Sequence, residues 1–211
     1  MNYTFADRLI MEFDRGLRTL TKKTRTSQRD NPAEQLPGED MSELDTQTAG
    51  RLMRVNHAGE IAAQGLYHGQ ALTARSQETL DRMNISASEE EDHLAWCEQR
   101  LKELDTPRSL IGPFWYWGSY AMGATAGVFG DKWSLGFVAE TEKQVEQHLQ
   151  NHLEKLPAND LKSRAIIKLM KEDEHHHGEA AKKLGGVDLP QPVQQGMKLV
   201  SKVMTVGAYW V

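Results

Sequence analysis

Glu90-Glu91-Asp92-His93 and Glu174-His175-His176-His177 are the two short stretches that decide the fold of this chain. Both read Glu-x-x-His, and each follows a lone glutamate, Glu60 or Glu142, by 30 or 32 residues. Residues i and i+3 share one face of an α-helix, so both side chains of each motif can turn inward. The spacing therefore predicts four helices that bring six metal-binding side chains together. The six are Glu60, Glu90, His93, Glu142, Glu174 and His177.

Four carboxylates and two imidazoles in this pattern indicate an all-α, ferritin-like four-helix bundle with a di-iron site. Two Fe(II) ions would balance the four carboxylate charges, whereas an empty site would force the carboxylates together. We therefore expect raised carboxylate pKa values and a less stable bundle without metal. Zinc and calcium suit this donor set less well, and manganese is second to iron. A single Glu-x-x-His motif usually lies on a solvent-exposed face of a helix, but two matched copies favour a metal-binding role.

Helix boundary signals divide the rest of the chain. The first predicted helix runs from about 44 to 75, and the second follows a capping box at Ser86-Ala87-Ser88-Glu89 and ends near 104. The third has Asp131 as its N-cap and ends at 156. The fourth starts at Asn159 or Asp160 and ends at Gly185-Gly186. A final apolar helix is expected at about 193–210. Two regions follow: residues 1–43, an amphipathic helix and a polar linker, and residues 44–211, the metal-binding domain. Phe5, Leu9, Phe13, Leu17 and Leu20 form the apolar stripe of the first helix, which could pack on the bundle or touch a membrane.

Composition excludes several classes of protein. The net charge of −5 and the lack of a basic stripe argue against a nucleic-acid binder. Cys97 is the single cysteine, so a disulfide framework is excluded. Acidic residues near the start interrupt any signal-peptide pattern, and the chain is therefore expected in the cytoplasm.

Residues 109–130 form an uncharged segment between Arg108 and Asp131. A membrane span here would place Glu90 and Glu142 on opposite sides of the bilayer, and the bundle could not close. We expect instead an additional apolar helix that faces the membrane and caps the bundle, with an ordinary buried helix as the alternative. The apolar stretch 197–204 could join the same surface. A metal site beside such a surface suggests a greasy substrate.

Several other residues are candidates for supporting roles. Asp92 and Asp173 could orient ligand imidazoles, and His57, His148 and His152 could lie just outside the ligands. A structural or exposed role is nevertheless favoured for each of these histidines, as it is for His68, His175 and His176. Candidate walls of a substrate pocket, for which core packing is the stronger interpretation, are Met53, Tyr67, Trp96, Leu135 and Phe137.

Three motifs resemble one family in particular. Arg54-Val55-Asn56-His57-Ala58-Gly59-Glu60, the stretch from Glu91 to Glu98, and Asp131-Lys132-Trp133-Ser134-Leu135-Gly136-Phe137-Val138 closely resemble the demethoxyubiquinone hydroxylases of ubiquinone biosynthesis (the Coq7 family). The resemblance covers most of the chain from about residue 44. It implies a non-haem di-iron monooxygenase that uses O2 as co-substrate and an external reductant, with NADH one candidate. The implied substrate is a polyprenyl demethoxy-benzoquinone or quinol.

The resemblance also assigns roles within the site. It implies that Glu60 and His93 serve one iron, Glu142 and His177 the other, and that Glu90 and Glu174 bridge. Animal members carry a tyrosine where this chain has Leu149, so a role of that tyrosine is not carried over.

The resemblance further implies a location and partners. The implied location is peripheral, on the cytoplasmic face of the cell membrane. The lipid surface, other ubiquinone-biosynthesis proteins and a second copy of this chain are further candidate partners. An iron-storage protein and a non-catalytic lipid-binding scaffold remain the alternatives.

Overall fold

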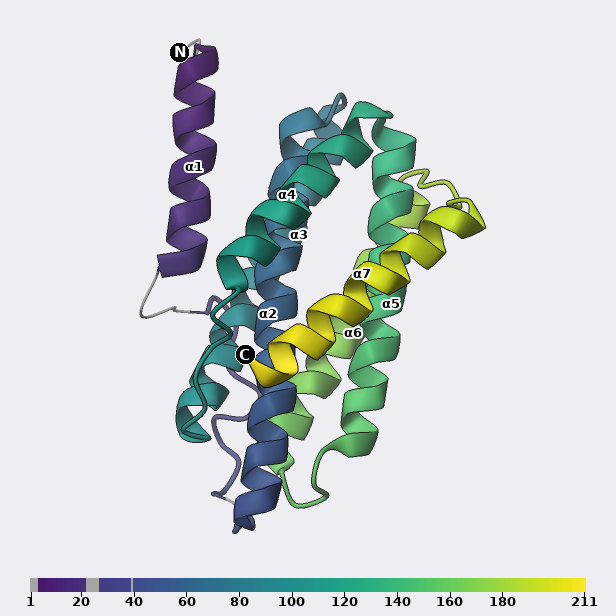
Figure 1. Ribbon diagram of the computed structural model, residues 1–211. Helices are drawn as coiled ribbons and strands as arrows, with labels where there is room; N and C mark the ends of the chain where they lie inside the picture. The colour runs from purple at the N-terminus through teal and green to yellow at the C-terminus, as the bar shows by residue number, and fades with distance from the viewer. Residues whose placement is uncertain (1–3, 22–26, 39) are drawn as a thin grey trace.

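The computed structural model describes residues 4–21, 27–38 and 40–211, and within these ranges it contains seven α-helices and no strand. The all-α prediction is therefore confirmed for the described residues. In chain order the helices are α1 (Phe5–Thr21), α2 (Glu43–Thr73), α3 (Gln77–Glu103), α4 (Gly112–Val128), α5 (Asp131–Lys155), α6 (Leu161–Lys183) and α7 (Gln191–Trp210) (Figure 1).

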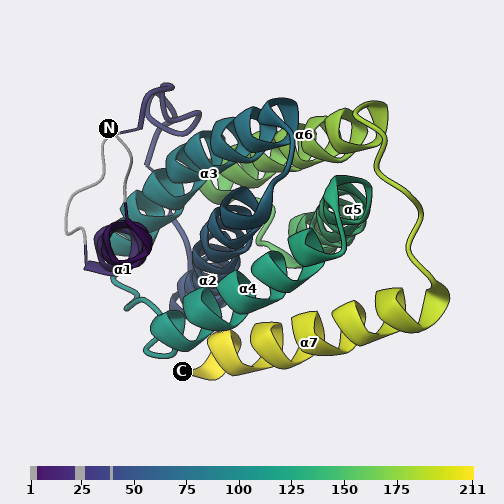
Figure 2. The same ribbon diagram turned by 90° about the horizontal axis from the view of Figure 1, so that it is seen from above.

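Helices α2, α3, α5 and α6 form a four-helix bundle made of two hairpins. Helix α2 packs against α3, α5 packs against α6, and α3 meets α6 across the bundle (Figures 1 and 2). A core of buried side chains fills one end, where Met53 of α2 meets Trp96 of α3 and Ile166 of α6. The bundle therefore holds the inward faces of four helices in fixed register.

The predicted helix starts are partly right. Helix α6 begins after Asp160, whose carboxylate accepts from Ser163 N at 2.9 Å, as predicted. The predicted capping box at Ser86–Glu89 is wrong, because α3 starts ten residues earlier, where Ser76 accepts from Thr79 N at 3.1 Å. Asp131 is not the N-cap of α5 either.

Gly130, at φ 106°, takes the N-cap place of α5. The carboxylate of Asp131 instead accepts from the backbone N–H groups of Arg75 and Ser76, at 2.9 and 2.8 Å. Asp131 thereby ties the start of α5 to the start of α3.

Helix α4 forms from the uncharged segment and lies along α2 (Figure 2). The two backbones come very close: a Cβ built on Gly65 would lie 2.2 Å from Tyr116 O, and one on Gly123 would lie 2.2 Å from Leu66 O. The other side of α4 is open, and Phe114 and Val128 are exposed there. Among the described helices, none is both long enough and apolar enough to cross a bilayer.

Helix α7 crosses the outer side of α2 and α5 (Figure 1). Ala208 is the buried residue of α7, and Arg54 of α2 holds the end of the helix by donating to the carbonyls of Ala208 and Tyr209 at 2.8 and 2.6 Å. The apolar side chains of Leu199 and Val203 point outward. Helix α7 is thus held at its end by Arg54, and near its start Gln144 of α5 donates to Gln194 O at 3.3 Å.

Helix α1 stands beside α4, and Phe13 stacks on Trp117 with ring centroids 5.8 Å apart. Tyr120 of α4 also donates to Glu12 at 3.3 Å. Of the predicted apolar stripe, the side chains of Phe5 and Leu9 lie outside the described part of the chain, as does the structure of residues 22–26 and 39. The division of the chain at residue 43 stays a prediction.

Candidate metal centre

Six buried side chains from four helices converge in the middle of the bundle. The ligand atoms of Glu60, Glu90, His93 and Glu174 lie within 4.8 Å of one another, and so do those of Glu142, Glu174 and His177. All six residues selected by spacing are therefore brought together, and the two groups meet at Glu174.

Glu90 and Glu174 lie between the two imidazoles. Glu90 places Oε2 2.8 Å from Nδ1 of His93 and Oε1 3.1 Å from Nδ1 of His177. Glu174 spans the same pair, at 3.6 and 3.5 Å. A carboxylate in this position can offer one oxygen to each of two metal ions, which is the geometry required for the predicted bridging role.

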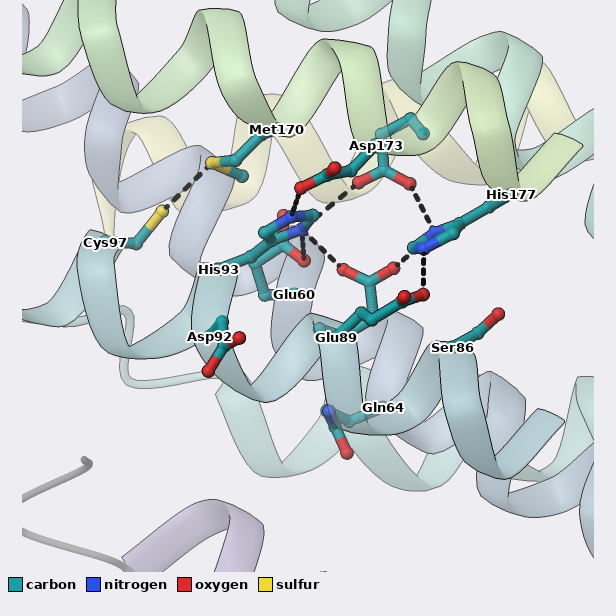
Figure 3. Close-up of polar contacts among 12 residues, drawn as sticks. Glu60, Gln64, Ser86, Glu89, Asp92, His93, Cys97, Met170, Asp173 and His177 are labelled. Atoms are coloured by element: carbon teal, nitrogen blue, oxygen red, sulfur yellow. Dashed lines mark hydrogen bonds and ion pairs between the residues drawn. The ribbon is translucent and has the colours of Figure 1, made fainter. Parts of the chain in front are cut away.

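The outer nitrogens of both imidazoles are held by acidic residues. His93 Nε2 lies 2.9 Å from Asp173 Oδ2, and His177 Nε2 lies 2.7 Å from Glu89 Oε2 (Figure 3). Each acid comes directly before the central glutamate of its own helix and binds the histidine of the facing helix. Such outer contacts fix the ring orientation, so both Nδ1 atoms face the centre. The prediction for Asp173 is confirmed, and Glu89 was missed.

Asp92 does not contact an imidazole, so that prediction is wrong. Its carboxylate accepts from Gln28 N at 2.6 Å and from Arg29 Nε at 3.0 Å, because it points away from the bundle centre toward the segment before α2. Arg29 also binds Asp173 through Nη1 at 2.9 Å and lies over the ring of Trp96. Arg29, which lies in the predicted linker, therefore contacts the residue that holds the outer nitrogen of His93.

The carboxylates and imidazoles of the centre shift one another's pKa values. Burial, together with the neighbouring Glu90, raises the pKa of Glu60 well above its usual value. Burial and Glu174 do the same for the pKa of Glu142. Both results agree with the expectation for an empty carboxylate site.

Glu90 departs from that expectation. Burial alone would raise its pKa, but the adjacent His93 and His177 hold the pKa of Glu90 well below its usual value. Burial disfavours charge on His177 too, yet its close contacts with the carboxylates of Glu174 and Glu89 raise its pKa to about 12. The two imidazoles on either side of Glu90 thus favour its charged form.

The donor atoms fit a hard or borderline divalent cation such as iron. Glu90 Oε1, Glu174 Oε2 and His177 Nδ1 are buried and have no hydrogen-bond partner of good geometry within the described residues. Buried polar atoms normally find partners, so these three point to a missing one. Cys97 stands apart, with its Sγ 3.8 Å from Met170 Sδ, and burial raises its pKa well above the usual value.

The remaining histidines lie outside the two ligand groups. His68 pairs with Tyr116 Oη at 2.8 Å and is structural, as expected. His152 is buried and pairs with Asn56 Oδ1 at 2.8 Å, while His148 lies beside it. His175 and His176 are exposed. His57 is buried one turn before Glu60.

Four of the five candidate pocket walls belong to the core: Met53, Tyr67, Trp96 and Leu135 are fully buried. Tyr67 also donates a hydrogen bond to Glu142, a contact that sequence reasoning missed (its only signal is its place two turns after Glu60). Phe137 alone lines a surface cavity.

Two cavities adjoin each other beside the centre. The inner cavity, of about 40 Å³, touches Glu60, Glu142 and Glu174, and Leu149 forms part of its wall. The apolar groove, of about 120 Å³, lies between α2, α4, α5 and α7, with Phe137 and Met122 among its lining residues. The inner cavity also shares His148, Ser201 and Thr205 with a polar cavity of about 400 Å³, so both an apolar and a polar surface lie beside the centre.

The bundle and its centre match one class of protein, the helix bundles with a buried cluster of carboxylates and histidines that can hold metal ions. Comparison with known families narrows this class. Residues 47–208 match the family described as "Ubiquinone biosynthesis protein COQ7", and the chain belongs to that family.

Its relatives are similar over nearly their full length. The chain is 52% identical over 205 residues to a 3-demethoxyubiquinol 3-hydroxylase of Nitrosococcus oceani, covering 97% of this chain and 96% of the relative. It is 52% identical over 210 residues to one of Acinetobacter baylyi, covering 100% and 99%. A third, of Ralstonia pickettii, is 51% identical over 214 residues, covering 96% and 98%.

Proposed function

We propose that this protein is a hydroxylase of ubiquinone biosynthesis that acts on the ring of a polyprenyl demethoxy-quinol. The relatives of the same length are named 3-demethoxyubiquinol 3-hydroxylase. The observation that carries the proposal is the buried six-residue centre opening into an apolar groove. A ring hydroxylase needs both a metal centre and an apolar place for its substrate.

The metal in this proposal is a pair of iron ions. Glu60 and His93 would hold one ion and Glu142 and His177 the other, with Glu90 and Glu174 able to contribute to both. When bound, the iron pair supplies the activation of O2, with two electrons and two protons from an external reductant, so that one oxygen atom enters the ring and the other leaves as water. NADH is a candidate source of those electrons.

The protein's own residues orient and shield this chemistry. Asp173 and Glu89 keep the two histidines turned inward, and Tyr67 holds the Glu142 carboxylate. The apolar groove takes the ring and the first part of the tail, and its lining excludes water from the reacting carbon.

The proposal includes a membrane position. Helices α4 and α7, which contribute to the groove, also carry exposed apolar side chains, among them Phe114 and Leu199. A surface of this kind can lie in the boundary of a bilayer, where a polyprenyl tail resides. We place it at the cytoplasmic face of the cell membrane, where other biosynthetic proteins or a second copy of the chain could also bind.

The test uses purified protein with Fe(II), a reductant, O2 and a short-tailed demethoxy-quinol. Wild type is expected to form the hydroxylated ring and to bind about two irons per chain. Glu60→Ala should lose both properties, because it removes a buried carboxylate from the centre. Glu78→Ala, on the exposed side of α3, is the matched control and should keep both. Absence of product with iron-loaded wild type would overturn the proposal.

The iron-storage alternative predicts a different stoichiometry. A storage protein would take up hundreds of irons per assembly, and its outer surfaces would be polar. Family membership and the apolar faces of α4 and α7 do not favour it. Iron analysis after size-exclusion chromatography separates the two functions.

A further inference from the structure

Gly59 has no packing role in α2, although it lies next to the candidate ligand Glu60. A glycine inside a helix destabilises it relative to alanine. Gly65 and Gly69, farther along α2, are explained by contact, because a Cβ on either would lie within 2.2 Å of a backbone oxygen of α4. A Cβ on Gly59 would meet no heavy atom of the described residues within 4 Å outside its own helix backbone. The space that a side chain at position 59 would occupy is therefore open.

The empty space is the junction of the two cavities. The inner cavity and the apolar groove adjoin at five shared lining residues, which together are called the neck. Two come from α2, one from α5 and two from α7: Gly59, Ala63, Val145, Ser201 and Met204. Gly59 and Ala63 are one turn apart, as are Ser201 and Met204, so two small residues of α2 face two residues of α7.

We propose that Gly59 is the residue that determines what reaches the metal centre, because its lack of a side chain keeps the neck open to the edge of the substrate ring. This inference rests on the proposed function. The inner cavity, at about 40 Å³, has room for a few water-sized groups but not for a whole ring with its tail. The ring body and tail occupy the groove, and only the reacting edge passes Gly59 toward Glu60 and Glu142.

Met204 forms the movable side of the neck. Methionine has three rotatable bonds and adapts to irregular spaces. It sits on α7, one turn before the residues that Arg54 holds, so its flexibility comes from its own side chain rather than from the helix. The opposite side, on α2, belongs to the bundle and cannot move without disturbing Glu60. A side chain added at position 59 would therefore narrow the neck from its rigid side.

The experiment compares Gly59→Ala and Gly59→Leu with wild type, using a short-tailed demethoxy-quinone. Three quantities are measured: equilibrium binding of the quinone to metal-free and iron-loaded protein, iron content with Tm, and kcat/KM. Gly59→Leu should raise the quinone Kd about 10- to 100-fold and lower kcat/KM by a similar factor. It should leave iron content unchanged and Tm unchanged or higher, because a glycine disfavours the helix, and Gly59→Ala should weaken quinone binding less.

Two further variants make the result decisive. Gly196→Leu, on exposed α7, also meets nothing within 4 Å of the described structure and should bind quinone as wild type does. Gly59→Leu combined with Met204→Ala should recover much of the binding, because space returns from the other side of the neck.

Wild-type binding by Gly59→Leu, or loss of its iron and stability, would overturn the inference. In the second case Gly59 would serve Glu60 or the fold instead. Failure of wild type itself to bind or hydroxylate the quinone would refute the proposed function instead.

Discussion

Arg29 links the segment before α2 to only one of the two imidazoles. Its guanidinium binds Asp173, which in turn accepts from His93 Nε2. Replacing Arg29 by glutamine removes the positive partner of Asp173, so His93 should be held less firmly. Changes in such outer contacts typically weaken metal affinity about 10- to 100-fold. We expect iron release to a chelator to become biphasic, with one iron leaving about 10-fold faster.

Two variants serve as controls for Arg29→Gln. Arg29→Lys keeps the charge but loses the paired contacts, and should fall between glutamine and wild type. Arg18→Gln removes an exposed ion pair with Asp14 on α1 and should leave release unchanged. Identical release kinetics in Arg29→Gln and wild type would show that Asp173 needs no support from Arg29.

His68 should make stability fall in acid. Burial, with Arg15 nearby, lowers its pKa from 6.5 to about 3. As the pH falls below about 6.5, the His68 imidazole therefore binds a proton in the unfolded chain but not in the folded protein. The stabilisation is complete above pH 6.5 and is lost as the pH falls toward 3, at most by about 1.4 kcal/mol per pH unit.

Urea unfolding of wild type and His68→Gln from pH 7.5 to 4.5 measures this effect. The difference in unfolding free energy between them should be constant above pH 7 and shift against wild type below 6.5. Exposed His175→Gln should run parallel to wild type at every pH. A pH-independent difference between His68→Gln and wild type would contradict the prediction.

Sequence reasoning at the residue level found all six converging side chains because their spacing is helical. It missed Glu89, although the signal was present: an acidic residue stands directly before the central glutamate in both halves, as Glu89-Glu90 and Asp173-Glu174. Asp92 was a wrong choice because it lies one residue before His93, and so points outward to Arg29. The contact of Tyr67 with Glu142 joins α2 to α5, and no local pattern predicts such a pairing.

Helices α2 and α4 depend on glycine where their backbones touch. Alanine at Gly65 would place its Cβ 2.2 Å from Tyr116 O, a backbone atom that cannot turn aside. Gly65→Ala should therefore push α4 away and destabilise the protein by about 1–3 kcal/mol. Gly196→Ala, which meets nothing within the described structure, should instead be neutral or stabilise α7 by up to about 1 kcal/mol. The urea concentration at half unfolding measures the effect of each variant. A midpoint of Gly65→Ala equal to that of wild type would contradict the close packing of α2 on α4.

Element boundaries were predicted best where one signal dominates. Asp160 and Pro157 mark the turn before α6 clearly, and the structure agrees. The start of α3 was misplaced because Ser86–Glu89 matches a capping box by sequence, while the helix simply continues through it. Ser76 is the true N-cap, but a Ser followed by Gln77, Glu78 and Thr79 is a weaker local signal. Tertiary contact between Asp131 and the start of α3 supplies what the local sequence lacks.

For the whole molecule, the sequence predicts an all-α chain but not the route of α7. Only Ala208 is buried there, so the apolar residues of α7 carry little information about where the helix docks. Its position comes from Arg54 and from the surfaces of α2 and α5, which exist only after the bundle has formed. The groove and the neck form only when α7 docks, so residue spacing cannot predict them.

The apolar residues on α4 and α7 should bind a lipid surface. Phe114 and Leu199 are exposed by 68% and 65%, and both helices lie on the same side of the bundle (Figure 2). Because the protein carries a net charge of −5, apolar burial rather than attraction to anionic lipid should drive this contact. Wild type should therefore float with zwitterionic vesicles, and added salt should not release it.

Phe114→Ser with Leu199→Ser should weaken this binding strongly. Each exposed apolar side chain that enters lipid contributes about 1.5–3 kcal/mol, so losing one should reduce partitioning about 10-fold or more. Leu161→Ser is the matched control, because Leu161 is exposed on α6, on the opposite side of the bundle. The double variant should keep its iron and its activity toward a short-tailed quinol dispersed in detergent. Flotation equal to wild type would place the lipid contact elsewhere, and loss of activity in detergent would mean that these side chains serve the groove itself.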